Sequence, residues 1–296
     1  MTNKAMLTLG PVLFNWPPEK WRDFYFRIAD EAPVDCVTLG EVVCSKRLPF
    51  FEPVMADVIE RLQGAGKEVV LSTLALIMNK REMDIVRDIT AMEGVLVEAN
   101  DVSTATLLAG RPHTIGPFIN IYNEGTLDFF AKKGATRVCL PVELSGTTLS
   151  VLAKNADVEL EVLAFGRLPL AVSARCYHAR AHTLSKDNCQ YVCADDPDGM
   201  DLDTLDGEAF LTVNGTQTLS YTCNNLIEEL GEMQETDINR FRLSPQDIDM
   251  VAVAQVFRDV LDGKTPAHDL EELADGLKFS NGYYHDREGG KMVAAE

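Results

Sequence analysis

The sequence predicts an α/β fold, a closed (β/α)₈ barrel of the TIM-barrel type that forms one domain over residues 1–296, and three observations lead to it. Short β-branched runs alternate with stretches of helical spacing, which is the pattern of a parallel sheet built from β-α units. About eight such units fit into the chain, whose length is close to the roughly 250 residues of an ordinary barrel. A composition of 46% hydrophobic and 25% charged residues is that of a globular protein with a large core.

Strands are expected where an apolar, β-branched run is bounded by turn residues. In chain order they are 6–10, 34–39, 68–72, 94–98, 114–121, 136–140, 158–165 and 238–243. An open doubly wound sheet is the alternative, but this number of consecutive units favours a closed barrel.

Two of the helices between and after these strands are well marked. Apolar side chains recur at helical spacing from Phe51 to Leu62. This stripe predicts an amphipathic helix over residues 52–63. The last helix is expected to begin with Ser244 as its N-cap and to end at Gly263. Both helices are expected to pack against the sheet and to carry no chemistry.

One long segment, residues 166–237, interrupts the alternation between the seventh and eighth strands. It is longer than an ordinary connection, and insertions of this length usually carry function. Its Asp-rich part, residues 195–206, is expected to be a surface loop. Cys176, Cys189 and Cys193 lie within the insertion at C-x12-C-x3-C spacing.

Cys44 follows the second predicted strand and is expected to meet these three cysteines, because all loops that follow the strands of a parallel barrel open on the same face. Thiolates bind iron–sulfur clusters or zinc. Structural zinc usually takes two closely spaced cysteine pairs, so the wide spacing favours a [4Fe–4S] cluster, with zinc and unligated cysteines as the alternatives. Cys36 and Cys139 are expected to be buried within strands, and Cys223 is the next candidate ligand.

The charge of the chain limits its partners. With 27 basic and 46 acidic side chains the formal net charge is −19, which is poorly matched to the phosphate backbone of nucleic acids. The sequence contains neither a secretory signal nor a stretch of roughly 20 apolar residues that could span a membrane. Seven cysteines in a chain too large to need disulfides indicate reduced thiols. We therefore expect a cytoplasmic protein without stable membrane insertion and without a nucleic-acid partner.

Hydrolytic motifs are missing from the sequence. His178 and His182 form an H-x3-H pair that could share a helix face and a zinc ion. The metalloprotease motif H-E-x-x-H needs a glutamate where this chain has Ala179, so surface or supporting histidines are the preferred interpretation. No G-x-S-x-G motif of serine hydrolases occurs either. The residues therefore give no support to a peptidase.

Polar and basic residues adjoin the expected barrel mouth. A polar residue at a strand end is often a helix cap or a loop anchor, but several around one rim predict a substrate pocket. These rim residues are Glu41, Glu98, Asn100, Asn120, Asn123 and Glu143. Lys46, Arg47 and Arg175 adjoin the cysteines and either balance the negative charge of a thiolate-bound cluster or form a solvated basic fringe.

Three motifs are similar to those of the U32 peptidase-like family. They are Gly-Glu-Val-Val-Cys-Ser-Lys-Arg at 40–47, Val-Glu-Leu-Ser at 142–145, and Phe-Gly-Arg-Leu-Pro-Leu-Ala-Val-Ser-Ala-Arg-Cys at 165–176. The likeness extends over essentially the whole chain. Within the family, the chain most resembles the branch that acts in ubiquinone biosynthesis.

This resemblance implies a set of ligands. It places a [4Fe–4S] cluster on one cysteine of the Cys-Ser-Lys motif and three around the Ser-Ala-Arg-Cys motif, which here are Cys44, Cys176, Cys189 and Cys193. Many family members carry a further cysteine shortly after the Phe-Gly segment, where this chain has leucine and proline. Under the resemblance, Cys44 then provides the fourth ligand.

The resemblance also implies a function: the iron–sulfur subunit of an oxygen-independent hydroxylase of the quinone ring, working as a heterodimer with a homologous, UbiU-like subunit. Because the substrate is prenylated and the chain has no basic amphipathic helix for membrane docking, a lipid-binding partner that delivers the substrate is expected. The alternative is a non-catalytic scaffold subunit, whose zinc or cluster site is structural while a partner performs the chemistry.

Overall fold

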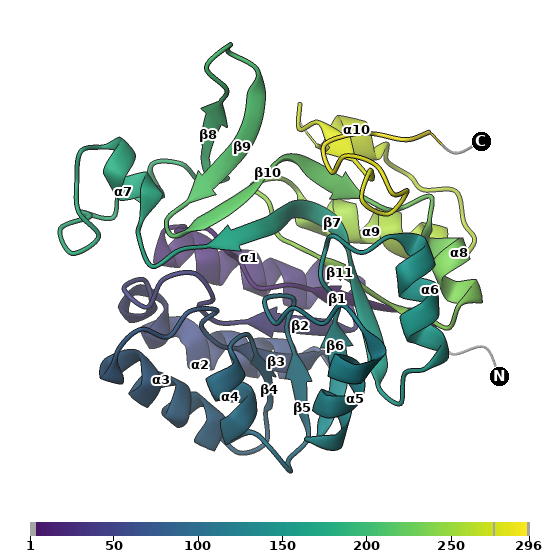
Figure 1. Cartoon of the computed structure of the whole chain (residues 1–296), viewed down its shortest axis with the longest axis horizontal. Coiled ribbons are helices and arrows are strands. Elements are labelled where there is room, and N and C mark those ends of the chain that lie inside the picture. The colour runs from purple at the N-terminus through teal and green to yellow at the C-terminus, as the bar shows by residue number, and fades with distance from the viewer. Residues whose placement is uncertain (1–3, 275, 295–296) are drawn as a thin grey trace.

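The computed structural model describes residues 4–274 and 276–294, and a closed parallel barrel lies at its centre (Figure 1). The strands of the barrel are β1 (Met6–Leu9), β2 (Cys36–Leu39), β3 (Glu68–Ser72), β4 (Leu96–Ala99), β5 (His113–Ile115), β6 (Ala135–Cys139), β7 (Glu159–Val172) and β11 (Arg240–Leu243). They pair in the order β11-β1-β2-β3-β4-β5-β6-β7, and β11 closes the ring on β7. The predicted (β/α)₈ barrel is confirmed.

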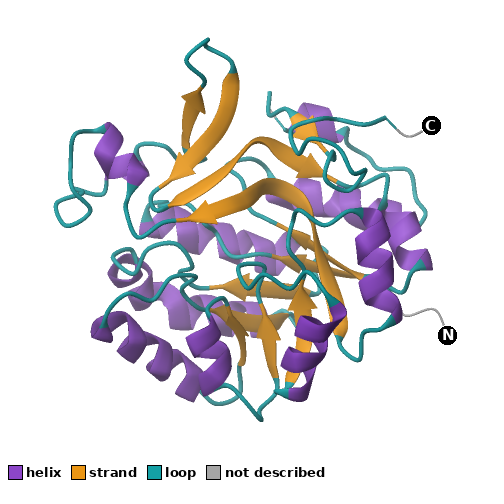
Figure 2. Ribbon diagram, in the orientation of Figure 1, coloured by secondary structure: helices purple, strands orange, loops and turns teal. Residues whose placement is uncertain are grey.

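Helices cover the outside of the barrel (Figure 2). They are α1 (Pro18–Glu31), α2 (Leu48–Gly64), α3 (Lys80–Ala91), α4 (Val102–Leu107), α5 (Glu124–Lys132), α6 (Gly146–Lys154) and α9 (Met250–Leu261). The apolar core lies between them and the strands, as large buried side chains such as Leu7, Phe241 and Phe257 indicate. No described helix combines the length and the apolar composition that crossing a membrane requires.

Strand β7 leaves the barrel and continues into a second sheet across the barrel mouth (Figure 1). Its first half pairs in parallel with β6 and β11, and its second half pairs antiparallel with β10 (Gln217–Asn225), followed by β9 (Ala209–Asn214) and β8 (Met200–Asp203). The strand changes partners at Gly166, which has φ +114° and lies so close to Ser244 that a Cβ would be 2.7 Å from its backbone oxygen. Only glycine fits this bend.

Short elements complete the insertion and the C-terminal part. They are α7 (Tyr177–Ala181), the 3₁₀ turn η1 (Val192–Ala194), α8 (Leu230–Glu235), α10 (Leu270–Leu273) and β12 (Phe279–Ser280). The Asp-rich residues 195–206 were expected to be a surface loop, and this is wrong in part, because β8 pairs with β9 there. Both faces of β8 are largely exposed, which explains its polar sequence.

Several other predicted boundaries differ from the structure, and the helix expected over 52–63, for example, begins at Leu48. The strand expected over 114–121 ends at Ile115, and the apolar run continues because Ile119 and Ile121 are buried in the following loop. The last helix begins after Asp249, whose carboxylate accepts hydrogen bonds from two backbone N–H groups of the first turn. The N–H of Ser244 instead donates to the carbonyl of Phe165 and extends the barrel pairing.

Charged side chains fill the interior of the barrel. Arg242 on β11 bonds both Glu98 on β4 and Glu161 on β7. Since β4 lies on the opposite side of the ring from β11, the ion pair between Arg242 and Glu98 crosses the interior of the barrel. Lower in the barrel, Arg137 and Glu68 make a second such bridge. Branched aliphatic side chains usually fill this space, so the interior is unusually polar.

Candidate metal centre

The four cysteines that the sequence singles out lie around one cavity. Cys44 is in the loop between β2 and α2, Cys176 is the N-cap of α7, Cys189 precedes η1 and Cys193 lies within it. All four line one small cavity of about 20 Å³ that is partly open to solvent. One thiol of the cavity therefore comes from the barrel loop after β2, and the other three come from the insertion.

Glu41 shapes the loop that carries Cys44. Its carboxylate accepts hydrogen bonds of 2.8 Å from the backbone N–H groups of Val43 and of Cys44. Burial raises the pKa of Glu41, against the opposing effect of Arg47 and of these two N–H groups. Glu41 is therefore a loop anchor and not a residue of the open barrel mouth.

Arg47 places a buried positive charge beside the thiols. Its side chain is 1% exposed and lines the cavity. Nη1 donates to the carbonyl of Leu13 at 2.7 Å and Nη2 to Oδ1 of Asn214 at 2.9 Å, whereas Nε has no partner among the described residues. Burial alone would lower the pKa of Arg47, but Glu41 and the nearby sulfur atoms raise it. The guanidinium thus stays charged and suits an anionic metal–thiolate group.

The hairpin between β9 and β10 closes the cavity. Asn214 and Gln217 pair at its base, which leaves Gly215 and Thr216 as a two-residue turn with φ +63° at the glycine. A Cβ on Gly215 would lie 2.9 Å from Nη2 of Arg47, and Thr216 Oγ1 donates to the carbonyl of Val43 at 2.8 Å. The turn therefore holds the Cys44 loop against the insertion.

Two hydrogen bonds reach the sulfur atoms themselves. Nδ2 of Asn15 donates to Sγ of Cys193, and the backbone N–H of Ala179 donates to Sγ of Cys176, both at 3.4 Å. Burial raises the pKa of Cys176, the N–H of Ala179 opposes this, and the neighbouring thiols add to it. Burial likewise raises the pKa of Cys44, and Arg47 opposes it. Donors of this kind stabilise a metal-bound thiolate and tune its electronic properties.

The donor set limits the groups that the cavity could hold. Four thiols line it, and four thiolates bind either a tetrahedral zinc ion or a [4Fe–4S] cluster. The buried guanidinium of Arg47 beside them suits a group with net negative charge. The residues therefore fit a [4Fe–4S] cluster, and the same four thiolates would also hold zinc.

The other cysteines and basic residues are distributed differently. Cys36 and Cys139 are buried in β2 and β6, as expected, and Cys223 is buried within β10, where burial raises its pKa to about 12. None of the three lines the cavity. Lys46 lines it, whereas Arg175 is exposed and does not.

Sequence reasoning missed several residues of the site, namely Asn15, Lys186, Tyr191, Asn214 and Gly215. The glycine between two β-branched runs of the insertion, at Gly215, signals a tight hairpin and could have been found. Asn15 and Lys186 carry no local signal, because their role depends only on what lies beside them in the fold.

The rim of the barrel mouth holds a separate open hollow of about 680 Å³, which lies between the loops after β4 and β5 and the side of α5. Three of the predicted rim residues line it, namely Asn100, Asn120 and Asn123. Asn123 is also the N-cap of α5. Glu98 is buried in the interior ion network and Glu143 accepts a hydrogen bond from the hydroxyl of Tyr122, so neither lines the hollow.

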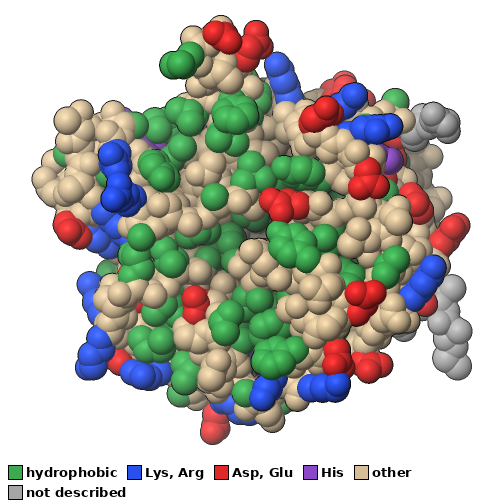
Figure 3. All heavy atoms as spheres, in the orientation of Figure 1, with side chains coloured by type: hydrophobic (Ala, Val, Ile, Leu, Met, Phe, Trp, Pro, Cys, Tyr) green, Lys and Arg blue, Asp and Glu red, His purple; other side chains and the backbone are tan. Residues whose placement is uncertain are grey.

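Apolar and polar side chains share the lining of this hollow, and an apolar cluster connects it to Cys44. Phe118, Ile119 and Phe129 line the hollow, and hydrophobic side chains gather over the centre of the face drawn in Figure 3. Phe118 also packs, together with Cys44, against a small buried cluster of Leu13, Val42 and Val43. A shared apolar cluster thus lies between the hollow and Cys44.

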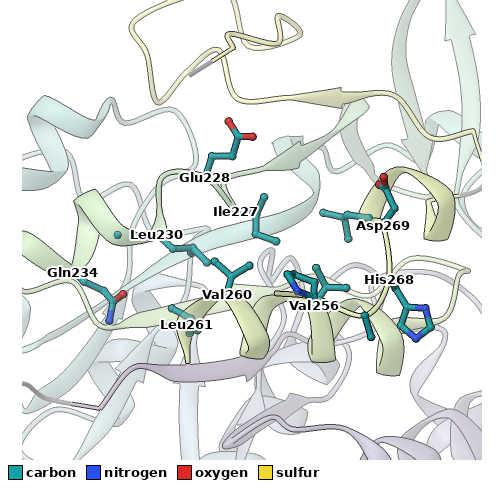
Figure 4. A pocket seen from close by; sticks show the side chains of 13 residues that line it. Ile227, Glu228, Leu230, Gln234, Val256, Val260, Leu261, His268 and Asp269 are labelled. Carbon is teal, nitrogen blue, oxygen red and sulfur yellow. The ribbon is translucent and has the colours of Figure 1, made fainter. Parts of the chain in front are cut away.

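A larger hollow, of about 750 Å³, lies outside the barrel between α8, α9 and the segment before α10. The side chains of Ile227, Leu230 and Val260 meet at its centre, whereas Glu228 and His268 point away from it (Figure 4). No cysteine lines this hollow. It therefore offers no chemistry that competes with the cysteine cavity.

Comparison with known proteins places the chain in a family. The chain is 23% identical over 232 residues to the tRNA hydroxylation protein P1 of Bacillus subtilis (strain 168), an alignment that covers 70% of this chain and 53% of that protein. The chain therefore spans about half the length of this relative. Residues 22–293 match the family described as Peptidase family U32. Because this match covers most of the chain, the protein belongs to the U32 family, as its motifs indicated.

Proposed function

We propose that this chain is the iron–sulfur subunit of an oxygen-independent hydroxylase that acts in ubiquinone biosynthesis, a UbiV-like protein that works with a homologous UbiU-like subunit. The observation that carries the proposal is the single cavity lined by Cys44, Cys176, Cys189 and Cys193 next to the buried guanidinium of Arg47. A [4Fe–4S] cluster bound there would supply one-electron redox chemistry. Within this site, Arg47 balances charge, and Asn15 and Ala179 donate hydrogen bonds to sulfur.

The relative named as a tRNA hydroxylation protein supports hydroxylation as the reaction type. It does not support the same substrate. A net charge of −19 opposes binding to the phosphate backbone of RNA, which depends on neutralisation by Lys and Arg. A small aromatic substrate with an apolar chain agrees better with this composition.

The hollow at the barrel mouth is the proposed substrate site. The barrel mouth is the usual position of active sites in this fold, and the volume of about 680 Å³ lies within the range of small-molecule sites. Phe118 and Phe129 supply apolar contacts for a ring and prenyl chain, and Asn100 and Asn120 supply polar groups for ring oxygens. The shared apolar cluster brings the ring next to the cysteine cavity.

Iron and sulfide analysis tests the proposal directly. The protein is purified without oxygen, and about four irons and four sulfides per chain with broad visible absorbance are expected for a cubane. A colourless protein with one zinc per chain contradicts it. Co-expression with the homologous subunit is expected to give a complex that co-elutes in size-exclusion chromatography.

Substrate delivery by a lipid-binding partner is part of this proposal. It is supported by the acidic charge and by the open, partly apolar hollow, which can accept a ring presented by another protein. The purified chain is then expected not to bind anionic liposomes by itself, because a chain of this charge is repelled by anionic lipids. Binding to such liposomes without a partner contradicts this part.

A structural role for the thiols is the second candidate. It is favoured by the position of the cavity, which joins the loop of Cys44 to the insertion with Cys176, Cys189 and Cys193. Cys176→Ala separates the two functions. If the variant stays folded and still binds the homologous subunit but no longer supports hydroxylation, the centre serves the reaction. If the variant unfolds, the centre is a structural link.

A further inference from the structure

A second group of metal-binding side chains lies next to the cysteine cavity and shares no residue with it. His178, His182 and Asp196 each offer one ligand atom, and these three atoms lie within 4.8 Å of one another. Nε2 of His178 is 2.8 Å from Oδ2 of Asp196. None of the three side chains lines the cavity of the four cysteines.

The fold holds the two histidines on one side of a short helix. His178 lies in α7 and His182 is its C-cap, and residues four apart face the same side of a helix. Their imidazole rings stack with centroids 5.8 Å apart and planes 9° apart. The backbone N–H of His178 donates to the carbonyl of Gly215 at 3.4 Å, which fixes α7 against the β9–β10 turn.

Asp196 is brought to the histidines from a different segment. It follows η1 by two residues, and the indole Nε1 of Trp16 donates to the carbonyl of Pro197 at 2.7 Å. The backbone carbonyl of Asp196 also accepts a bond from Gly199. The carboxylate is thus held from the loop after β1 and from its own turn, and its position does not depend on the histidines alone.

The chemistry of the group is that of a metal site and not of an ion pair alone. Oδ1 of Asp196 accepts no hydrogen bond from the described residues. Nδ1 of the fully buried His178 also has no partner among them. A simple hydrogen-bonded pair leaves both of these atoms unused.

The group is open to solvent on one side. His178 is completely buried, whereas His182 is exposed and the side chain of Asp196 is 33% exposed. An ion can therefore enter from water and keep water in its remaining positions. Two imidazoles and one carboxylate with open positions suit a divalent first-row transition ion.

We propose that His178, His182 and Asp196 form a mononuclear site for a divalent transition-metal ion, separate from the four-cysteine centre. The site joins α7, whose N-cap is Cys176, to the segment that directly follows η1 and its Cys193. An ion there fixes these elements relative to each other and presents an exchangeable water beside the cysteine cavity.

Cobalt binding tests the site without any activity measurement. Protein loaded with iron and sulfide is titrated with Co²⁺ without oxygen, and bound cobalt is followed by equilibrium dialysis and by the difference in visible absorption from the same protein without cobalt. The wild type is expected to bind one Co²⁺ without thiolate-to-cobalt charge-transfer absorption. His182→Ala changes an exposed side chain and is expected to weaken this binding by at least about 10-fold, as is Asp196→Asn.

His268→Ala is the matched control, because His268 is also exposed and belongs to a different surface. It is expected to bind cobalt as the wild type does. Equal binding by the wild type and His182→Ala, or no binding by the wild type, overturns the proposal and leaves a hydrogen-bonded His–Asp pair. Cobalt on free cysteines is recognised by its charge-transfer absorption and is unaffected by His182→Ala. Failure of the cluster and failure of this site are therefore distinguished.

Discussion

Nη2 of Arg47 donates to Oδ1 of Asn214 at 2.9 Å and joins the second β-α loop of the barrel to the hairpin of the insertion. The two residues are 167 positions apart in the sequence. Asn214 Nδ2 and Arg47 Nη1 also share the carbonyl of Leu13, each at 2.7 Å. This small network sets the distance between Cys44 and the cysteines of the insertion.

Replacing Arg47 tests whether this network supports the centre. Arg47→Met is expected to lower the free energy of unfolding by about 3 kcal/mol or more, because it removes one partner of buried charged interactions, and to reduce the iron content. Urea unfolding and iron analysis measure the two effects. Arg175→Met, at an exposed arginine outside the cavity, is expected to change neither, and equal behaviour of the two variants contradicts the role of Arg47.

The glycine of the β9–β10 turn is expected to matter through Arg47. Gly215 and Gly207 both have positive φ, at +63° and +82°, but a Cβ on Gly215 meets the guanidinium of Arg47 whereas one on Gly207 meets nothing within 4 Å. Each change to alanine is expected to cost about 1–3 kcal/mol of backbone strain. Only Gly215→Ala is expected to lose iron as well. If Gly207→Ala loses as much iron, the contact with Arg47 is not the cause.

The ion network inside the barrel predicts a pH dependence of stability. Burial alone would raise the pKa of Glu161, but Arg242 and two further arginines hold it below its ordinary value of 4.5. The pairing therefore stabilises the fold above that pH and loses its effect as the pH falls through the lower pKa of the folded state. Glu161→Gln is expected to cost about 3 kcal/mol or more at pH 7.

The difference in unfolding free energy between wild type and Glu161→Gln is expected to shrink as the pH falls below 4.5, because the carboxylate of the unfolded wild type then takes up a proton while that of the folded protein still carries its charge. Urea unfolding at a series of pH values measures it. A difference that stays constant from pH 7 to pH 3 contradicts the charge pairing of Glu161.

The hollow at the barrel mouth is expected to bind the prenylated ring through its aromatic side chains. Phe129 is 53% exposed and lines the hollow, and Val151 on α6 is 43% exposed and does not. Phe129→Ser is expected to reduce hydroxylation at least about 10-fold with unchanged iron content, since a buried aromatic contact is worth more than 1.4 kcal/mol. Val151→Ser is expected to leave both unchanged. Equal activity of the two variants places the substrate elsewhere.

The barrel could be predicted because each of its strands has a local signal. Runs such as 68–72 and 136–140 are apolar and β-branched in the sequence and lie in β3 and β6 of the structure. The sequence could not show that β7 continues to Val172, because residues 166–172 extend the strand only by pairing with β10, about 50 positions later. The exposed β8 has no buried face and therefore no alternating pattern.

For the candidate metal centre, too, some features could be predicted from the sequence and others only from the structure. Residue type alone indicates that cysteines can bind a metal or a cluster. Topology predicts that they meet, because loops that follow parallel strands open on one face. These cysteines are Cys44, Cys176, Cys189 and Cys193. The tertiary structure alone decided that Arg47 is buried beside them and that Asn15 reaches Cys193. It also decided that Asp196 joins the histidines of α7. The physical reason is that hydrogen bonding, charge pairing and burial depend on distances between residues far apart in the chain, which no local pattern contains.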